Sequence, residues 1–111
     1  MKTILVADDV AEVRNFLAAI LSRAHYAVVT AGTLVEAQHV CQEQKVAMVV
    51  LDDLDRGGAE WAVQLHSSGV PTLYTGAFIA APDVPSLTKP IAMGDLLARV
   101  RGMIGEPLIR E

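Results

Sequence analysis

Cysteine is nearly absent from the sequence, whose 111 residues include a single one, Cys41. One cysteine can form neither an internal disulfide nor a cysteine-based zinc site. Cys41 lies at helical spacing from Leu34 and Ala37, so we expect it to fill part of an apolar core. The three histidines are too scattered along the chain to indicate a metal site.

Long hydrophobic runs are missing as well. The longest uninterrupted apolar runs, residues 16–21 and 46–51, contain six residues each, whereas a helix needs roughly 18 to span a bilayer. The apolar stretch of the N-terminal sequence MKTILVADD is too short for a signal peptide and runs into two aspartates. We therefore expect a cytoplasmic protein without a membrane segment.

Positive charge is scarce and dispersed. Nine lysine and arginine residues stand against 13 aspartate and glutamate residues, and the net charge is −4. A protein that binds nucleic acid usually gathers its basic residues on one face, so this pattern argues against nucleic acid as a partner. Hydrophobic residues at 52% and charged residues at 20% instead indicate one folded domain with a modest core.

Short apolar segments that suit buried strands alternate with helical patterns along the chain. The predicted strands are residues 3–7, 26–30, 46–51 and 70–74. This alternation implies βα units around a parallel sheet with helices on both faces. We expect a single domain over residues 1–105, a C-terminal tail at 106–111 and no output domain.

Helical periodicity follows each of the first three strands and returns near the C-terminus. The apolar stripe of the first helix consists of Val13, Phe16, Leu17, Ile20 and Leu21. Thr33 and Glu36 form a capping box that opens the second helix. A short third helix includes residues 61–65, and the last covers residues 96–104.

Reactive side chains follow most of the predicted strands. Asp8 and Asp9 follow the first strand, Asp52 and Asp53 the third and Thr75 the fourth, while Lys89 and Pro90 precede the last helix. In a doubly wound sheet, ligands bind beyond the carboxyl ends of the strands, where the winding reverses. If the first and third strands are neighbours, as in the order 2-1-3-4-5, at least three carboxylates converge.

Converging carboxylates repel one another, and some take up protons unless a cation lies between them. Hard oxygen ligands in an incomplete cage suit Mg²⁺, which keeps part of its water shell and shares a phosphate. The hydroxyl of Thr75 and the ammonium group of Lys89 supply donors for phosphoryl oxygens. The arrangement suits the transfer of a phosphoryl group to an aspartate.

These motifs together resemble the receiver domain of two-component response regulators. The matching segments, which extend over essentially the whole chain, are ILVADD (4–9), VVLDD (49–53), PTLYTG (71–76) and LTKPI (87–91). The resemblance implies an α/β, flavodoxin-like fold with a doubly wound, five-stranded parallel sheet in the order 2-1-3-4-5. It also implies a stand-alone receiver in a phosphorelay, which takes a phosphoryl group from a histidine kinase or a histidine phosphotransfer protein and signals to an unidentified downstream protein.

The resemblance also implies which aspartate accepts the phosphoryl group. Counting back from Gly57 and Gly58, taken as the turn after the acceptor, places the acceptor at Asp52 rather than Asp53. The predicted strand 46–51 also delivers Asp52 first at its end. We expect Asp53 and Asp55 to be solvated loop residues. Beyond self-phosphorylation from small donors and self-dephosphorylation, no enzymatic activity is expected.

The remaining site residues are carried over from the same resemblance. Asp9 is implied as a direct Mg²⁺ ligand and Asp8 as a ligand through water, with Asp52 and the backbone carbonyl of Leu54 completing the protein ligands. Thr75 is implied to bind a phosphoryl oxygen. Lys89 is implied to pair with the phosphoryl charge, its amine directed at Asp52 by a cis peptide bond to Pro90.

The sequence departs from the receiver pattern in several places. Arg56 replaces a proline, Glu60 replaces a glycine, and Ser86 stands where many receivers carry a switching aromatic residue. Only 13 residues separate Thr75 from Lys89, and two prolines interrupt them. We therefore expect the fourth helix to be shortened or missing.

The short segment after Thr75 leads to expectations about signalling. Phe78 and Ile79 are expected to cover apolar surface that a fourth helix would otherwise cover, and any uncovered patch would suit dimerisation or a partner. Phosphorylation is expected to change mainly the loops 52–58 and 75–82, with no aromatic rotation on the fifth strand.

Two other functions are compatible with parts of this pattern. A degenerate receiver could act as a non-phosphorylated interaction module, which the altered region 76–88 favours. A hydrolase of the haloacid dehalogenase type is suggested by the sequence DLD at 53–55. That family places its nucleophile ahead of the acidic pair, however, whereas the acidic pair comes first in this chain.

Overall fold

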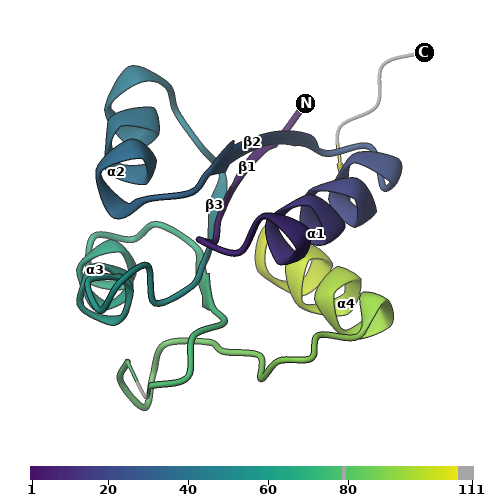
Figure 1. The fold of residues 1–111 in the computed structure, drawn as a ribbon. Helices are drawn as coiled ribbons and strands as arrows, with labels where there is room; N and C mark the ends of the chain where they lie inside the picture. The colour runs from purple at the N-terminus through teal and green to yellow at the C-terminus, as the bar shows by residue number, and fades with distance from the viewer. Residues whose placement is uncertain (79, 108–111) are drawn as a thin grey trace.

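Parallel strands form the centre of the computed structural model, which describes residues 1–78 and 80–107 (Figure 1). In these residues the strands are β1 (Thr3–Ala7), β2 (Ala27–Ala31), β3 (Met48–Leu51) and β4 (Thr72–Tyr74). They pair in the order β2-β1-β3-β4, and every pairing is parallel. The predicted doubly wound sheet is therefore present, with β1 and β3 adjacent.

Helices cover both faces of this sheet, with α1 and α4 on one side and α2 and α3 on the other (Figure 1). Their bounds are Ala11–Arg23 for α1, Leu34–Glu43 for α2, Gly58–Ser67 for α3 and Met93–Ile104 for α4. The predicted capping box opens α2, since the Thr33 hydroxyl accepts a hydrogen bond from the Glu36 amide at 3.1 Å. No helix in the described part of the chain is long and apolar enough to cross a membrane.

The residues of each strand alternate between two apolar cores, one on each face of the sheet. On β1, Ile4 and Val6 belong to the core beneath α1 and α4, while Leu5 belongs to the core beneath α2 and α3. Strand β3 follows the same rule and is buried throughout. Burial on both faces explains why these strands read as continuous apolar runs in the sequence. Cys41 is half-buried against the α2 and α3 core, as expected.

The prediction of a fifth strand is wrong, because the described residues form a four-stranded sheet and only one isolated bridge beside β4. Tyr74 bridges Ser86 in parallel: its N–H donates to the Pro85 carbonyl at 2.9 Å, and its carbonyl accepts from the Leu87 N–H at 3.0 Å. To continue this pairing toward the start of β4, the residue at position 85 would have to donate a backbone N–H. Proline has no N–H, so the ladder cannot extend in that direction.

The connection between β4 and α4 agrees with the expected loss of a helix, since residues 75–78 and 80–92 form none. The predicted role of Phe78 is wrong, because its side chain is 60% exposed, and Ile79 lies outside the described residues. Val84 covers this part of the core instead and is only 6% exposed. A turn in which the Val84 N–H bonds the Ala81 carbonyl at 3.1 Å folds it inward.

Candidate functional site

Polar side chains line up at the carboxyl edge of the sheet, one residue beyond each of the three strands β1, β3 and β4. Backbone hydrogen bonds hold this row in register. The Asp8 N–H donates to Ala31 at 3.1 Å, the Asp52 N–H to Ala7 at 2.9 Å and the Thr75 N–H to Leu51 at 2.8 Å. The edge therefore brings together Asp8, Asp52 and Thr75, as the sequence predicted.

Strand alternation also decides which way these side chains point. Ala7 and Leu51 face the α2 and α3 core, so the next residues, Asp8 and Asp52, fall on the opposite side. Both carboxylates are nearly inaccessible, at 1% and 7% exposure. Thr75 is also buried. It falls on the same side as Asp8 and Asp52, because Leu73, two residues before it, belongs to the α1 and α4 core.

Lys89 enters this site from the segment before α4. Its Nζ donates to Asp52 Oδ1 at 2.7 Å and to Asp8 Oδ2 at 2.9 Å. The peptide bond between Lys89 and Pro90 is cis. The predicted cis bond and the predicted direction of the amine toward Asp52 are both confirmed.

The charges of this group stabilise one another. Burial alone would raise the pKa of Asp52, but hydrogen bonds from Lys89 and from the Leu54 N–H outweigh it, so the pKa lies below its ordinary value. Burial alone would likewise lower the pKa of Lys89, and its bonds to the two carboxylates raise it instead. At neutral pH the site therefore holds a charged Lys89 bonded to a charged Asp52.

The neighbouring carboxylate of Asp9 completes a group that could hold a metal ion. One oxygen each from Asp8, Asp9 and Asp52 lies within 4.8 Å of the others. Desolvation beside the other carboxylates, a hydrogen bond with Asp52 and the charges of Asp52 and Asp8 raise the pKa of Asp9. Three carboxylate oxygens on one side of a partly open site are a donor set that suits a hard divalent cation with remaining water ligands.

The loop after Asp52 has an unusual backbone. Leu54, Asp55 and Arg56 all lie in the left-handed region, with φ of 45°, 57° and 81°, a conformation that costs about 1–2 kcal/mol per non-glycine residue. The Leu54 N–H donates to Asp52 Oδ2 at 3.3 Å. A Cβ at Gly58 would overlap the Asp52 carbonyl, so only glycine fits there. The Leu54 carbonyl as a metal ligand stays a prediction.

Asp53 was expected to be a solvated loop residue, and this expectation is wrong. Its Oδ1 accepts a hydrogen bond from the Tyr74 hydroxyl, and its Oδ2 accepts one from the Ala77 N–H at 2.8 Å. Sequence reasoning missed Tyr74 altogether. The alternation of side chains offered a signal, because it places both residues on the α2 and α3 side: Tyr74 on β4, and Asp53 two residues beyond the adjacent strand β3. Asp55 is exposed, as expected.

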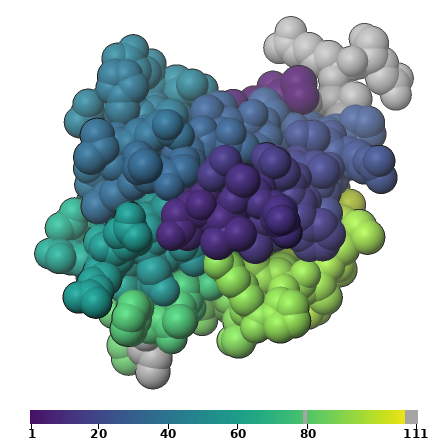
Figure 2. All heavy atoms as spheres, in the orientation of Figure 1, coloured from purple at the N-terminus to yellow at the C-terminus, as the bar shows by residue number. Residues whose placement is uncertain are grey.

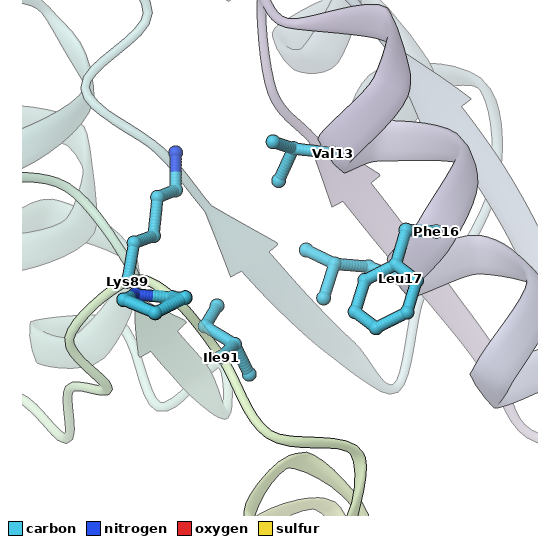
Figure 3. A pocket seen from close by; sticks show the side chains of 6 residues that line it. Val13, Phe16, Leu17, Lys89 and Ile91 are labelled. Atoms are coloured by element: carbon cyan, nitrogen blue, oxygen red, sulfur yellow. The ribbon is translucent and has the colours of Figure 1, made fainter.

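An apolar groove of about 540 Å³ lies beside Lys89, between α1 and the segment before α4 (Figure 3). Val13, Phe16 and Leu17 line it from α1, opposite Lys89, Pro90 and Ile91. Phe16 was expected in the buried stripe of α1, but it is 51% exposed because it lies at the border of this groove. Residues of α1 and α4 adjoin on this face of the molecule (Figure 2).

Comparison with known proteins gives matches among solved structures only. No protein-family model matches the chain. No curated protein sequence matches it either. A receiver domain protein from Methanospirillum hungatei has a TM-score of 0.83 and 22% sequence identity, and the match covers 94% of each chain.

Other receiver structures match over a similar length. The chemotaxis protein CheY4 from Vibrio cholerae has a TM-score of 0.76 and 20% identity over 93% of this chain and 98% of that one. A response regulator from Burkholderia pseudomallei, crystallised with a phosphorylated aspartic acid, a calcium ion and citrate, has a TM-score of 0.75 and 24% identity. That match covers 89% of this chain and 66% of the other. The chain thus has the fold of the receiver domains of response regulators.

Proposed function

We propose that the protein is a phosphorelay receiver that accepts a phosphoryl group on Asp52 from the phosphohistidine of a histidine kinase or a histidine phosphotransfer protein. The observation that carries this proposal is the position of Lys89 Nζ, 2.7 Å from Asp52 and 2.9 Å from Asp8, beside a third carboxylate. A surface ion pair would not need two buried carboxylates at the ends of adjacent strands. The arrangement instead prepares positive charge where a phosphoryl group would arrive.

In the proposed reaction, a carboxylate oxygen of Asp52 forms a bond to phosphorus. The bond between phosphorus and the imidazole nitrogen of the donor breaks, and the imidazole keeps the electron pair and takes up a proton from solvent. Lys89 shifts part of its hydrogen bonding from Asp52 to a phosphoryl oxygen. The Thr75 hydroxyl donates to another phosphoryl oxygen.

Mg²⁺ is the cation that we propose for the group formed by Asp8, Asp9 and Asp52, with the Leu54 carbonyl as a further ligand. The three carboxylate oxygens fit such an ion. When bound, it would neutralise negative charge on the phosphoryl oxygens. The phosphorylated aspartate and the calcium ion of the Burkholderia pseudomallei response regulator support an acceptor and a divalent cation site in this fold.

Phosphate uptake measured by intact-mass spectrometry tests the proposal. Wild-type protein incubated with acetyl phosphate and Mg²⁺ is expected to gain one phosphoryl group, and EDTA is expected to prevent the gain. A phosphorylated histidine phosphotransfer domain should transfer its group to the same residue. We propose no other enzymatic activity than this self-phosphorylation and the later self-dephosphorylation.

A non-phosphorylated interaction module is the second candidate, because the region between Thr75 and α4 has lost its helix and most of its strand. Such a module would take up no phosphoryl group from either donor. It would also show no change in Trp61 fluorescence on addition of Mg²⁺ and beryllofluoride. A response to these reagents would therefore contradict the second candidate and support the first.

A further inference from the structure

One carboxylate, that of Asp53, connects the two loops that carry the proposed chemistry. Asp53 follows the acceptor directly, and its two oxygens accept from the Tyr74 hydroxyl and from the Ala77 N–H. Tyr74 precedes Thr75, and Ala77 follows it by two residues. The chain is therefore bonded to Asp53 on both sides of Thr75, at Tyr74 and at Ala77. We call these three groups the Asp53–Tyr74 clasp.

Packing makes the Tyr74 half of this clasp rigid. Its side chain is 1% exposed, within the core formed by residues such as Leu54, Trp61 and Val84. Burial and the hydrogen bond to Asp53 raise its pKa, so the hydroxyl stays protonated and remains a donor at neutral pH. The tyrosine thus extends from the core to hold a carboxylate at the rim of the site.

Gly76 gives independent evidence that the loop is shaped around this pair. A Cβ built on Gly76 would collide with both the Asp53 carboxylate and the Tyr74 hydroxyl. Its backbone therefore passes so close to the pair that a larger residue would have to displace the Asp53 carboxylate and the Tyr74 hydroxyl. No helix follows in residues 75–78 and 80–92, so loop contacts such as these decide where the residues after Thr75 lie.

We propose that Asp53 and Tyr74 are positioning residues, which act on the phosphoryl transfer by holding Thr75 against the acceptor loop. This inference rests on the proposed function. A hydroxyl that is fixed before the phosphoryl group arrives stabilises the reaction more than one that must first be ordered. In this chain the clasp, rather than a helix after β4, supplies that order.

Tyr74→Phe tests the clasp most cleanly, because it keeps the buried ring and removes only the hydroxyl. We expect it to slow phosphorylation by acetyl phosphate about two- to tenfold, the range that one hydrogen bond corresponds to. The rate should be measured well below the melting temperature, so that a small loss of stability has no influence on it. Mg²⁺ affinity is expected to stay unchanged, since the hydroxyl does not contact the carboxylates of Asp8 and Asp9.

Tyr26→Phe is the matched control. Tyr26 is also buried, and its hydroxyl donates to the Gly105 carbonyl at 2.8 Å, away from the acceptor. Acetyl phosphate is expected to phosphorylate this variant at the wild-type rate. Asp53→Ala should slow the reaction at least as much as Tyr74→Phe, and the double variant should be no slower than Asp53→Ala alone, because both changes remove the same interaction.

Amide exchange provides a readout that does not depend on the reaction. The Ala77 amide should exchange faster in Asp53→Ala and in Tyr74→Phe than in wild type, and Tyr26→Phe should leave it unchanged. If Tyr74→Phe keeps the wild-type rate and the wild-type exchange of Ala77, the clasp is overturned and the proposed function stands. If wild-type protein takes up no phosphoryl group at all, the proposed function fails first, and the role of the clasp in it fails as well.

Discussion

The chain contains two acidic pairs that look alike in sequence, Asp8–Asp9 after β1 and Asp52–Asp53 after β3, and the structure uses them differently. The first member of each pair is buried and binds Lys89. The second members differ. Asp9 is exposed and lies with the other carboxylates, whereas Asp53 is half-buried and binds Tyr74 and Ala77.

The difference arises in the backbone that follows each pair. After Asp9 the chain enters α1 within two residues, and the Val10 N–H bonds Asp8 Oδ1 at 2.9 Å. After Asp53 the three residues 54–56 with positive φ delay the start of α3 until Gly58. The second aspartate of an identical pair thus belongs to the candidate cation site in one loop and joins two loops in the other.

The largest expected effect distinguishes the aspartates of the second pair. Asp52→Asn should abolish phosphorylation by acetyl phosphate, because it removes the nucleophilic carboxylate. Asp53→Asn should still gain one phosphoryl group, but more slowly. Asp55→Asn is the control, since Asp55 is exposed and its variant should match wild type. A phosphoryl adduct on Asp52→Asn in intact-mass spectra would show that the acceptor is another residue.

Removal of Lys89, which bonds both Asp8 and Asp52, should have the next largest effect. Lys89→Met leaves two buried carboxylates without their cation, and we expect it to cost on the order of 2 kcal/mol of unfolding free energy, less than for a fully buried pair because Lys89 is partly exposed. Denaturant unfolding without Mg²⁺ measures this cost. An unchanged free energy of unfolding would contradict the charge arrangement described above.

The pH dependence of that cost follows from the two pKa shifts. The pKa of Asp52 is lowered, so its contribution is present above its ordinary value of 3.8 and is lost as the pH falls through the lower folded value. The pKa of Lys89 is raised, so its contribution is present below 10.5 and is lost as the pH rises through the higher folded value. The difference between wild type and Lys89→Met should shrink as the pH falls, starting above pH 3.8, because burial without the lysine raises the pKa of Asp52 in the variant.

A smaller effect concerns Asp9, the exposed member of the first pair. Mg²⁺ should stabilise the wild-type protein by about 1.4 kcal/mol when its free concentration is ten times Kd, because it binds the folded form. Asp9→Ala should remove this gain, while Glu43→Ala, which removes an exposed charge at the end of α2, should keep it. Thermal unfolding at matched ionic strength measures both. A wild-type melting temperature that does not respond to millimolar Mg²⁺ would contradict the site.

The smallest expected effect concerns the space around Asp53. Gly76→Ala should destabilise the protein by about 1 kcal/mol, because the added methyl group collides with Asp53 and Tyr74. Gly102→Ala is the control, since nothing lies within 4 Å of its added Cβ in α4. That change should stabilise the protein by about 0.5–1 kcal/mol. Chemical denaturation that gave the same sign for both variants would contradict the close approach at Gly76.

Much of the candidate site could be predicted because it depends on strand ends. Periodicity located β1, β3 and β4 to within two residues, and in a parallel sheet the residues that follow such strands meet at one edge. Asp8, Asp52 and Thr75 therefore came together as expected. Asp53 did not follow its prediction, because the composition of a loop indicates exposure. The alternation that places Asp53 and Tyr74 on the same side of the sheet does not give the distance between them.

The sequence by itself determined the alternation of strands and helices, the capping box of α2 and the acidic edge, since each depends on local periodicity or on residues adjacent in the chain. It also determined that a fifth strand could not extend past Pro85, although this consequence became visible only with the register of Tyr74 and Ser86. The tertiary structure alone decided which second aspartate joins the cation group and which joins Tyr74. That choice depends on the turn after each strand and on side chains far apart in sequence, whose distances are fixed only when both faces of the sheet are packed.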